Sequence, residues 1–325
     1  MPPLPKPFFV LAPMDDVTDS VFRRVVARCA PPDLFFTEFV NVDGLQSPGR
    51  PRLLKKLRFT DKEQPLIAQI WGNKPENYRA VAEQIADGSL ADELGVPGLQ
   101  FAGIDINMGC PEKNVVNNGS CSALINNPEL ALEIINATKA GAAGRLPVSV
   151  KTRLGFNEVD FSWHELLLQQ DLAMLTVHGR TRKEMSKVPA RWEDIAKVRE
   201  LRDKLGVQTL IVGNGDVESR EQGEALAKEY DLDGVMVGRG VFHDPYVFAK
   251  DSDWDNFSKQ ARMELFLDHI DLFAQTWQPG ERATHTLNKF CKIYINNFDG
   301  AKELREDFMQ ADDVADLRQR VSDAL

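Results

Sequence analysis

The sequence contains eight short apolar runs, each followed by a polar or glycine-containing turn and then by a segment with helical spacing, most clearly Trp192–Leu205. This alternation favours a parallel sheet, because the connection between two parallel strands has to cross the sheet and is usually a helix. Eight strand–helix units over about 240 residues are typical of a (β/α)8 barrel, the TIM barrel. We therefore predict this α/β fold, with strands at Phe8–Leu11, Leu34–Thr37, Pro65–Ala68, Ile104–Ile106, Pro147–Val150, Leu172–Val177, Thr209–Val212 and Gly234–Val237.

A doubly wound open sheet is the competing fold. Its glycine-rich fingerprint follows the first strand, whereas the first run here ends in Ala-Pro-Met at positions 12–14. Glycine pairs instead follow the seventh and eighth runs, as Gly213 with Gly215 and as Gly238 with Gly240. TIM barrels commonly bind phosphate at those two strand ends. The position of the glycines therefore favours the barrel.

The pattern changes near residue 250, after which helical spacing replaces the strand-like runs. We predict a catalytic barrel domain over residues 1–250 and a small all-helical domain over residues 251–325, in which the segments 262–277, 283–297 and 301–325 form three or four helices. The helical domain contains nine Lys and Arg residues against fifteen Asp and Glu residues, and the whole chain has a formal net charge of −10. An acidic balance counts against a nucleic-acid partner unless basic side chains gather on one face.

Composition argues against several other classes of protein. No apolar run approaches the ~20 residues that a membrane-spanning helix needs, and the proline-rich residues 1–7 lack the order of a signal peptide. The four cysteines, Cys29, Cys110, Cys121 and Cys291, have no C-x-x-C spacing, so neither a disulfide framework nor a metal site is indicated. We expect a cytoplasmic, reduced protein that binds no metal and does not enter a membrane.

In a TIM barrel every strand points its carboxyl end at the same mouth, so the residues after the predicted strands describe one site. Here almost every run is followed by a polar or charged side chain. The glycine pairs allow backbone N–H groups to approach an anion closely, and Arg239 adds a guanidinium, so we predict a bound phosphate there. Gln69, Asn107 and Lys151 offer donors and acceptors for a planar heterocycle, and Met14 offers an apolar surface for its ring.

Cys110 belongs to the same set of strand ends, and its role has two interpretations. It follows the run Ile104–Ile106, and Pro111 prevents that strand from continuing inside a sheet. A free cysteine is often a small buried hydrophobe, but catalytic groups of barrels also stand at strand ends. No histidine or carboxylate adjoins Cys110 to prepare a thiolate, whereas a protonated thiol that acts as an acid needs no such neighbour. The residues alone predict a barrel for a phosphorylated flat cofactor, with a cysteine beside it.

These strand ends together resemble the tRNA-dihydrouridine synthase family, whose members are flavin-dependent reductases of uridine in tRNA. The most specific motif is the Asn-x-Gly-Cys-Pro turn at 107–111, followed in order by Lys-x-Arg-Leu-Gly at 151–155 and His-Gly-Arg-Thr at 178–181. The resemblance covers most of the predicted barrel, with further matches at Leu11–Met14, Thr37–Phe39, Ala68–Ile70, Gly213–Asp216 and Gly238–Gly240.

The resemblance implies that FMN occupies the barrel mouth, that NADPH reduces it, and that Cys110 donates a proton to C5 of a uracil that receives a hydride at C6. It implies substrate contacts from Asn107, Arg153 and Arg180, and tRNA binding by the domain at 251–325. We expect the protein to act as a monomer. The residues that the resemblance assigns to FMN are Pro13, Met14, Asp15, Gln69, Lys151, His178, Asn214, Gly215, Asp216, Gly238 and Arg239.

Three other functions stay open at this point. The same FMN barrel could reduce a free pyrimidine or another small molecule, or Lys151 could form a Schiff base in an aldolase that holds no flavin. The chain could also be an RNA-binding scaffold that no longer catalyses, although folding alone does not need Asn107, Cys110, Lys151 and His178 together. The segment 117–122 departs from the family pattern and carries a second cysteine, Cys121, whose role the sequence leaves open.

Overall fold

The computed structural model describes residues 3–325, so Met1 and Pro2 of the proline-rich start and of the predicted first domain lie outside the described residues. The chain forms two compact units. The first combines the residues up to 20 with 32–217 and 221–238, and the second combines 21–31, 218–220 and 239–325. The longest segment of the second unit thus begins at Arg239, and the second unit also contains most of the first helix, α1 (Ser20–Cys29). The domain boundary at residue 250, with a role for each domain, stays a prediction.

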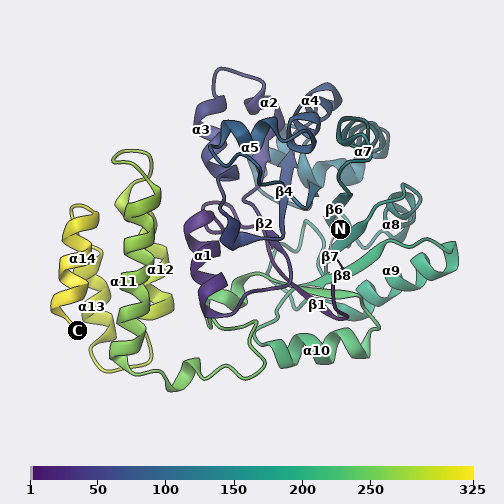
Figure 1. Ribbon diagram of the computed structural model, residues 1–325. Coiled ribbons are helices and arrows are strands. Elements are labelled where there is room, and N and C mark those ends of the chain that lie inside the picture. Colours follow the sequence, from purple (N-terminus) through teal and green to yellow (C-terminus); the bar gives the residue numbers. More distant parts are fainter. Residues whose placement is uncertain (1–2) are drawn as a thin grey trace. The chain divides into compact units, whose positions relative to one another are not determined.

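The first unit contains a closed barrel of parallel strands (Figure 1). The strands follow one another in the order β1-β9-β8-β7-β6-β5-β4-β2, and a parallel bridge between Val10 and Leu34 joins β1 to the start of β2 and closes the ring. The predicted (β/α)8 fold is therefore confirmed, and one short additional strand, β3, pairs with β4. The strands are β1 (Phe8–Leu11), β2 (Phe35–Phe36), β3 (Val40–Asn41), β4 (Leu66–Trp71), β5 (Gly103–Met108), β6 (Val148–Arg153), β7 (Met174–His178), β8 (Leu210–Asn214) and β9 (Gly234–Val237).

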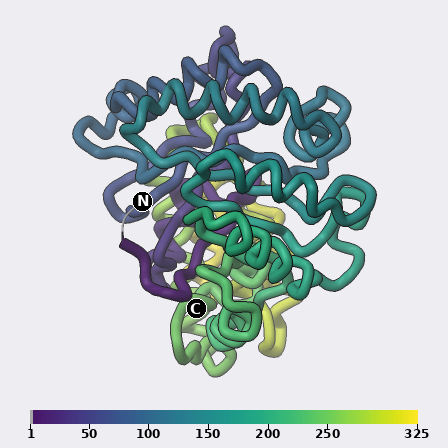
Figure 2. The backbone as a smooth tube through the Cα atoms, turned by 90° about the vertical axis from the view of Figure 1, so that its right-hand side faces the viewer, coloured from purple at the N-terminus to yellow at the C-terminus, as the bar shows by residue number. Residues whose placement is uncertain are grey.

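Helices cover the outside of this barrel, and the teal coils of α7 to α9 face the viewer in Figure 2. The helix predicted at Trp192–Leu205 is confirmed as α9. Acidic residues in its first turn and basic residues in its last turn complement the helix dipole, and Gly206 ends it in the left-handed region. The helices of this unit are α2 (Val42–Leu45), α3 (Arg50–Leu54), α4 (Pro75–Ala86), α5 (Ser89–Glu93), α6 (Lys113–Asn117), α7 (Pro128–Ala142), α8 (Phe161–Leu168), α9 (Trp192–Leu205) and α10 (Arg220–Glu229).

The interior of the barrel is apolar in one part and polar in another. Alternate residues of a strand share one face, and one buried apolar cluster consists of Phe8, Val10, Ala12, Leu34, Phe36, Ile67, Met174, Val212 and Met236. At neighbouring positions, β4, β5 and β6 contribute the buried polar residues Gln69, Asp105 and Ser149. Burying such groups is costly unless each one is hydrogen-bonded. Their hydrogen bonds lead toward the candidate site described below.

The contact between α4 and α7 leaves no space for a side chain at Gly141. A Cβ atom there would lie 2.2 Å from the backbone oxygen of Arg79 and 2.9 Å from the Cβ atom of Ala82. We expect Gly141→Ala to lower the free energy of unfolding by about 1–3 kcal/mol, because the two helices have to separate. Urea unfolding followed by circular dichroism measures this change. Higher stability, which the better helix propensity of alanine alone would give, would contradict the prediction.

The second unit is helical, and aromatic rings fill its interior. Phe22 packs on the rings of Phe290 and Phe242, with centroids 4.9 and 6.0 Å away. The guanidinium of buried Arg262 lies 4.1 Å from the ring centroid of Trp254 and donates to the Trp254 backbone oxygen at 2.5 Å, so this buried charge has partners. Its helices are α1 (Ser20–Cys29), α11 (Lys259–Thr276), α12 (Asn288–Tyr294), α13 (Ala301–Phe308) and α14 (Val314–Asp323).

The three helical segments predicted after residue 250 correspond to α11, to α12, and to α13 with α14. The last segment is divided, because a turn at 309–313 separates α13 from α14. Asp313 begins α14 as its N-cap and accepts from the Asp316 N–H at 2.9 Å. Within residues 3–325, no helix combines the length and the apolar character that crossing a membrane requires.

Candidate active site

The register of the strands brings many of the predicted site residues to one end of the barrel. Asn107 pairs with Lys151 across β5 and β6, and Arg153, His178 and Asn214 form one row across β6, β7 and β8. Because all the strands are parallel, these positions lie at the carboxyl ends, where barrel enzymes carry their active sites. Side chains that are far apart in the sequence thus share one candidate site.

Asn107 fixes the turn that carries Cys110. Its Oδ1 atom accepts hydrogen bonds from the backbone N–H groups of Gly109 and Cys110, both at 3.0 Å. Asparagine is suited to such turns, because its short side chain reaches the backbone two and three residues further along. The Ser122 hydroxyl donates to the backbone oxygen of Cys110 at 2.8 Å, and the Cys110 side chain is half-buried. Cys110 therefore stands just after β5 in a turn that is held from both sides.

Cys121, whose role the sequence leaves open, lies next to Cys110. It is fully buried at the start of the short helix η3 (Cys121–Asn126), and burial raises its pKa well above the ordinary value, so its thiol keeps the proton and donates to the Cys110 sulfur. That hydrogen bond lowers the pKa of Cys110 to about 7, with burial opposing the shift and the Glu112 N–H and Arg153 adding to it. A general acid works best when its pKa is near the working pH. The thiol pair thus suits Cys110 to proton donation.

We expect iodoacetamide to alkylate Cys110 with a midpoint near pH 7, because the thiolate is the nucleophile. Burial raises the pKa of Cys29 and of Cys291 to about 12, so those thiols react slowly. Cys121→Ala removes the hydrogen-bond donor and should raise the midpoint, whereas Cys121→Ser keeps a donor and should raise it less. Mass spectrometry of the alkylated peptide over a series of pH values measures the midpoint.

Cys291→Ala is the matched control for this experiment. Its thiol is also buried, but it lies in the helical unit, so the midpoint of Cys110 should stay near pH 7. If Cys121→Ala keeps the wild-type midpoint, the hydrogen bond between the two thiols does not set the pKa of Cys110, and the prediction is wrong.

Lys151 and Asn214 form the second part of the site. The Lys151 ammonium donates to Asn214 Oδ1 at 3.0 Å, and Asn214 Nδ2 donates to the backbone oxygen of Met236 at 2.8 Å. Burial lowers the pKa of Lys151 to about 8, Arg153 adds to this shift, and Asp105 opposes it. Lys151 is therefore still largely a cation at pH 7. On β7, which lies between the strands of Lys151 and Asn214, the buried Thr176 hydroxyl has no hydrogen-bond partner among the residues that the structure describes.

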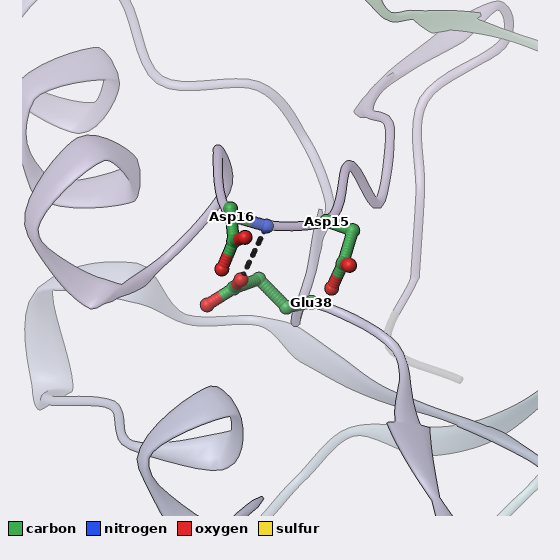
Figure 3. A group of neighbouring side chains, drawn as sticks. All are labelled: Asp15, Asp16 and Glu38. Atoms are coloured by element: carbon green, nitrogen blue, oxygen red, sulfur yellow. Dashed lines mark hydrogen bonds between the residues drawn. The ribbon is translucent and has the colours of Figure 1, made fainter. Parts of the chain in front are cut away.

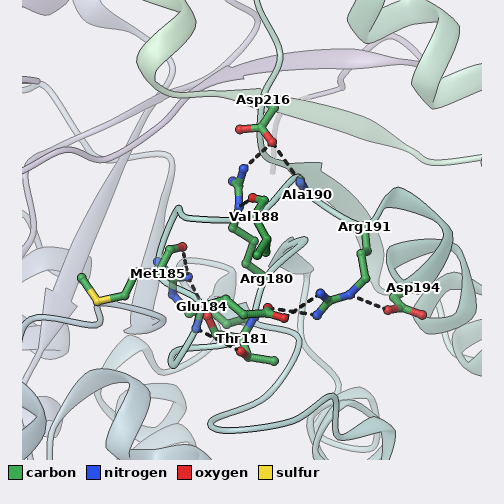
Figure 4. A network of polar contacts seen from close by, with 10 residues as sticks. Arg180, Thr181, Glu184, Met185, Val188, Ala190, Arg191, Asp194 and Asp216 are labelled. Atoms are coloured by element: carbon green, nitrogen blue, oxygen red, sulfur yellow. Dashed lines mark hydrogen bonds and ion pairs between the residues drawn. The ribbon is translucent and has the colours of Figure 1, made fainter.

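A network of polar contacts follows β7 (Figure 4). Arg180 is only 3% exposed, its Nε donates to the Val188 oxygen at 2.5 Å, and its Nη2 forms an ion pair with Asp216. Its Nη1 lies 3.1 Å from His178 Nε2. Because a guanidinium only donates, Nε2 of His178 accepts, and the ring proton is placed on Nδ1. Arg180 thus supports His178 and Asp216 from inside the protein, and its contact with substrate stays a prediction.

Arg153 joins this network to the turn that carries Cys110. Its Nε donates to the Gly109 oxygen at 2.6 Å, and its Nη1 donates to the oxygens of Thr181 and Met185 at 3.1 and 2.9 Å. The loop itself is tied by Glu184, which accepts from the Thr181 N–H at 2.7 Å and also pairs with Arg191 of the segment that enters α9. Arg153 therefore couples two strand ends, while its predicted role in substrate binding stays untested.

Three neighbouring carboxylates follow the first two strands, Asp15 and Asp16 after β1 and Glu38 after β2 (Figure 3). Oxygens of the three lie within 4.8 Å of one another, a spacing that would allow a metal ion. The Asp16 N–H donates to Glu38 Oε1 at 2.6 Å, and the Lys56 ammonium pairs with Asp15, so protein groups already offset part of the negative charge. We assign no metal to this group, and a cofactor contact of Asp15 and of the preceding Pro13 stays a prediction.

The two predicted phosphate turns lie near other site residues. Gly215 has φ 136°, which favours glycine, and a Cβ atom there would lie 3.3 Å from the His178 ring. A Cβ atom at Gly238 would lie 3.9 Å from the Met14 sulfur, so these two residues are neighbours as well. Arg239 follows directly in the chain, but it opens η4 (Arg239–Phe242) and belongs to the second unit. Its contact with a phosphate stays a prediction.

Our sequence reasoning missed two polar residues behind the site, Asp105 and Ser149. Asp105 is fully buried and accepts from the Ser149 hydroxyl at 2.6 Å and from Gln69 Nε2 at 2.8 Å. A signal was present in the sequence, because strands of a parallel barrel usually read as continuous apolar runs. A carboxylate or a hydroxyl inside such a run indicates a polar interior.

Comparison with known proteins identifies the family. The family model described as dihydrouridine synthase (Dus) matches residues 10–325. The chain belongs to this family. It is 46% identical over 318 residues to a "Probable tRNA-dihydrouridine synthase" of Staphylococcus aureus (strain COL), covering 97% of this chain and 92% of the relative. It is 45% identical over 324 residues to "Probable tRNA-dihydrouridine synthase 2" of Bacillus subtilis (strain 168), covering 98% and 94%.

A solved structure supports the fold. The histamine dehydrogenase of Rhizobium sp. 4-9 superposes with a TM-score of 0.53 at 11% sequence identity, over 81% of this chain and 48% of that one. At this identity the likeness concerns the fold alone. The resemblance to the dihydrouridine synthase family that the strand-end motifs indicated is confirmed by the family match and by the two relatives.

Proposed function

We propose that this protein is a tRNA-dihydrouridine synthase, an oxidoreductase that uses FMN and NADPH to reduce the C5–C6 double bond of uridines in tRNA. Membership of the family and the names of the relatives support this reaction. The observation that carries the proposal is the turn held by Asn107, which sets the acidic thiol of Cys110 at the barrel end that also holds Lys151 and His178. Nothing in the folding of a barrel requires this combination.

The donor set at the barrel end fits a flavin. The pyrimidine edge of the ring carries acceptors, which a cationic Lys151 and the side-chain amides complement, and the buried Thr176 hydroxyl there still lacks a partner among the described residues. Bound FMN would supply the hydride for C6 of the uracil. The residues that we propose to hold FMN are Pro13, Met14, Asp15, Gln69, Lys151, His178, Asn214, Gly215, Asp216, Gly238 and Arg239.

The proposed role of Cys110 is to hold the proton that C5 receives, so that one hydride and one proton together saturate the double bond. The thiolate left on Cys110 is stabilised by the Cys121 thiol and by the nearby Arg153 guanidinium. Asn107 keeps the thiol in place through the backbone of the turn, and we propose that Asn107, Arg153 and Arg180 help to position the base. A uridine stacked in folded tRNA has to leave its stack to reach these groups, at a cost of a few kcal/mol.

The helical segment 251–325 is proposed to bind tRNA, in a protein that acts as a cytoplasmic monomer. Its charge is acidic overall, with nine basic and fifteen acidic residues, and several of its basic side chains are already paired. Arg318 pairs with Asp271 at 2.6 Å, and Arg320 pairs with Asp307 at 2.6 Å. We therefore expect tRNA affinity to depend only weakly on salt, because the salt slope grows with the number of phosphate contacts, and the paired arginines leave fewer cations to make them.

The test of this proposal uses the purified full-length protein. It should be yellow, and with NADPH it should form dihydrouridine in tRNA taken from cells that lack this protein, as measured by mass spectrometry of tRNA fragments. Those fragments also identify which uridines are reduced. Reduction of free pyrimidines without any reduction of tRNA would favour the small-molecule reductase. A colourless protein whose Lys151 is trapped by borohydride with a carbonyl compound would favour the aldolase.

A further inference from the structure

A single line of hydrogen bonds runs from the interior of the barrel to the turn that carries Cys110. We propose that Asp105 is a positioning residue, which sets the orientation of the Gln69 and Asn107 amides and, through them, the place of Cys110. The catalytic importance of that place rests on the proposed function, whereas the hydrogen-bond line itself does not.

The orientation of each amide follows from the turn. Backbone N–H groups can only donate, so the two N–H groups of Gly109 and Cys110 require the oxygen of the Asn107 amide. Asn107 Nδ2 therefore points to Gln69 and donates to its Oε1 at 3.1 Å. Gln69 in turn has to present Nε2 to its other neighbour, Asp105, at 2.8 Å. Every link of the line donates inward, and it needs an acceptor at its inner end.

Asp105 supplies that acceptor in either protonation state. Its Oδ2 accepts from Gln69 and its Oδ1 accepts from Ser149 at 2.6 Å, with the carboxyl group fully buried. Burial raises the pKa of Asp105 to about 6, against the hydrogen bonds from Ser149 and Gln69. When the carboxyl takes up a proton, the Ser149 hydroxyl can turn and accept a hydrogen bond from the new carboxyl O–H, because a hydroxyl both donates and accepts. The bond to Gln69 is kept, so what matters at position 105 is the acceptor rather than the charge.

Two substitutions at position 105 should therefore have opposite effects on this line of hydrogen bonds. Asp105→Asn can direct its carbonyl oxygen to Gln69 and its amide N–H to Ser149, which preserves the line. Asp105→Ala leaves Gln69 Nε2 without an acceptor in a buried place, at a cost that favours rearrangement of the amides. If the Gln69 amide turns over, Asn107 loses its acceptor and no longer presents its oxygen to the turn. Cys110 would then lose the hydrogen bond that its sulfur accepts from the Cys121 thiol.

The experiment measures the pH midpoint of Cys110 alkylation by iodoacetamide, without tRNA or NADPH. We expect Asp105→Ala to move the midpoint from about 7 toward the ~8.5 of an unperturbed thiol, and Asp105→Asn to restore it. Ser149→Ala is the matched control: it also removes a hydrogen bond of Asp105, but it leaves the line from Asp105 to Cys110 complete. Gln69→Met, which breaks the line one link further on, should reproduce the shift if Asp105→Ala fails to fold.

A wild-type midpoint in Asp105→Ala or in Gln69→Met would overturn the proposal, even if either variant is less stable to heat. An equal shift in Ser149→Ala would also overturn it, because a general loosening of the barrel would then explain the result. Failure of the proposed function is a separate outcome. In that case the unaltered protein forms no dihydrouridine in tRNA, whatever the alkylation midpoints are.

Discussion

Cys110→Ala should keep the yellow colour and the FMN affinity of the unaltered protein and lose about 10²–10⁴-fold in the rate of dihydrouridine formation, the usual contribution of a general acid. The FMN affinity is retained because none of the proposed cofactor contacts comes from Cys110. The rate falls because C5 of the uracil then has no thiol to take a proton from. Mass spectrometry of tRNA in single-turnover reactions with prereduced enzyme measures this step.

The pH dependence of that step gives a second readout. Since the thiol of Cys110 has to be protonated to donate, and its pKa is lowered to about 7, the rate in the unaltered protein should fall as the pH rises through about 7. This alkaline decline should be absent from the residual rate of Cys110→Ala. Cys291→Ala, which removes a buried thiol of the helical unit, is the control and should behave as the unaltered protein. Near-wild-type dihydrouridine formation in Cys110→Ala would refute the role of Cys110.

Lys151→Met should weaken FMN binding by about 10–100-fold, the range expected for losing a hydrogen bond that involves a charge, about 1.5–3 kcal/mol. Methionine keeps the unbranched shape of the lysine stem, so the main loss is the ammonium group that donates to Asn214 at 3.0 Å. Titration of the flavin-free protein with FMN, followed by quenching of the flavin fluorescence, measures the affinity. In the unaltered protein the affinity should fall as the pH rises through about 8, because Lys151 then loses its proton.

Lys139→Met is the matched control for this prediction. Lys139 lies in α7 and donates to the Gln170 oxygen at 2.9 Å, on a helix outside the barrel. The Lys139→Met protein should therefore have the FMN affinity of the unaltered protein at every pH. An FMN affinity of Lys151→Met within twofold of the unaltered protein would show that the ammonium does not contact the cofactor, and Lys151 would leave the proposed site.

Much of the fold could be predicted from local patterns. The helix at Trp192–Leu205 was predicted to the residue from its helical spacing, and its acidic first turn, its basic last turn and Gly206 agree with those bounds. The strands were found as apolar runs that end in polar residues. Strand β3 was missed, because two residues carry too little periodicity to be recognised. The last segment, 301–325, consists of α13 and α14, so the three or four helices expected after residue 250 are four α-helices among the described residues.

The candidate site was predictable as a list of residues but not as an arrangement. Position after a predicted apolar run marks Gln69, Asn107, Lys151, His178 and Asn214, which the structure places in the last residues of strands, because every strand of a parallel barrel ends at the same mouth. The sequence also presented Arg180 as a substrate-binding residue, and that role stays a prediction. What the sequence could not show is that its guanidinium is buried and contacts His178, Val188 and Asp216. A charged side chain in a motif does not show whether its partners are substrate or protein.

By itself the sequence determined the barrel, the set of strand ends and Cys110 as the reactive candidate, because these depend on local spacing along the chain. Only the tertiary structure decided how those groups act on one another. It set the buried thiol of Cys121 against Cys110, and it joined Asp105 to Gln69, 36 residues away in the chain. The physical reason is that such hydrogen bonds depend on the register between neighbouring strands and on the packing of η3, which no local pattern encodes.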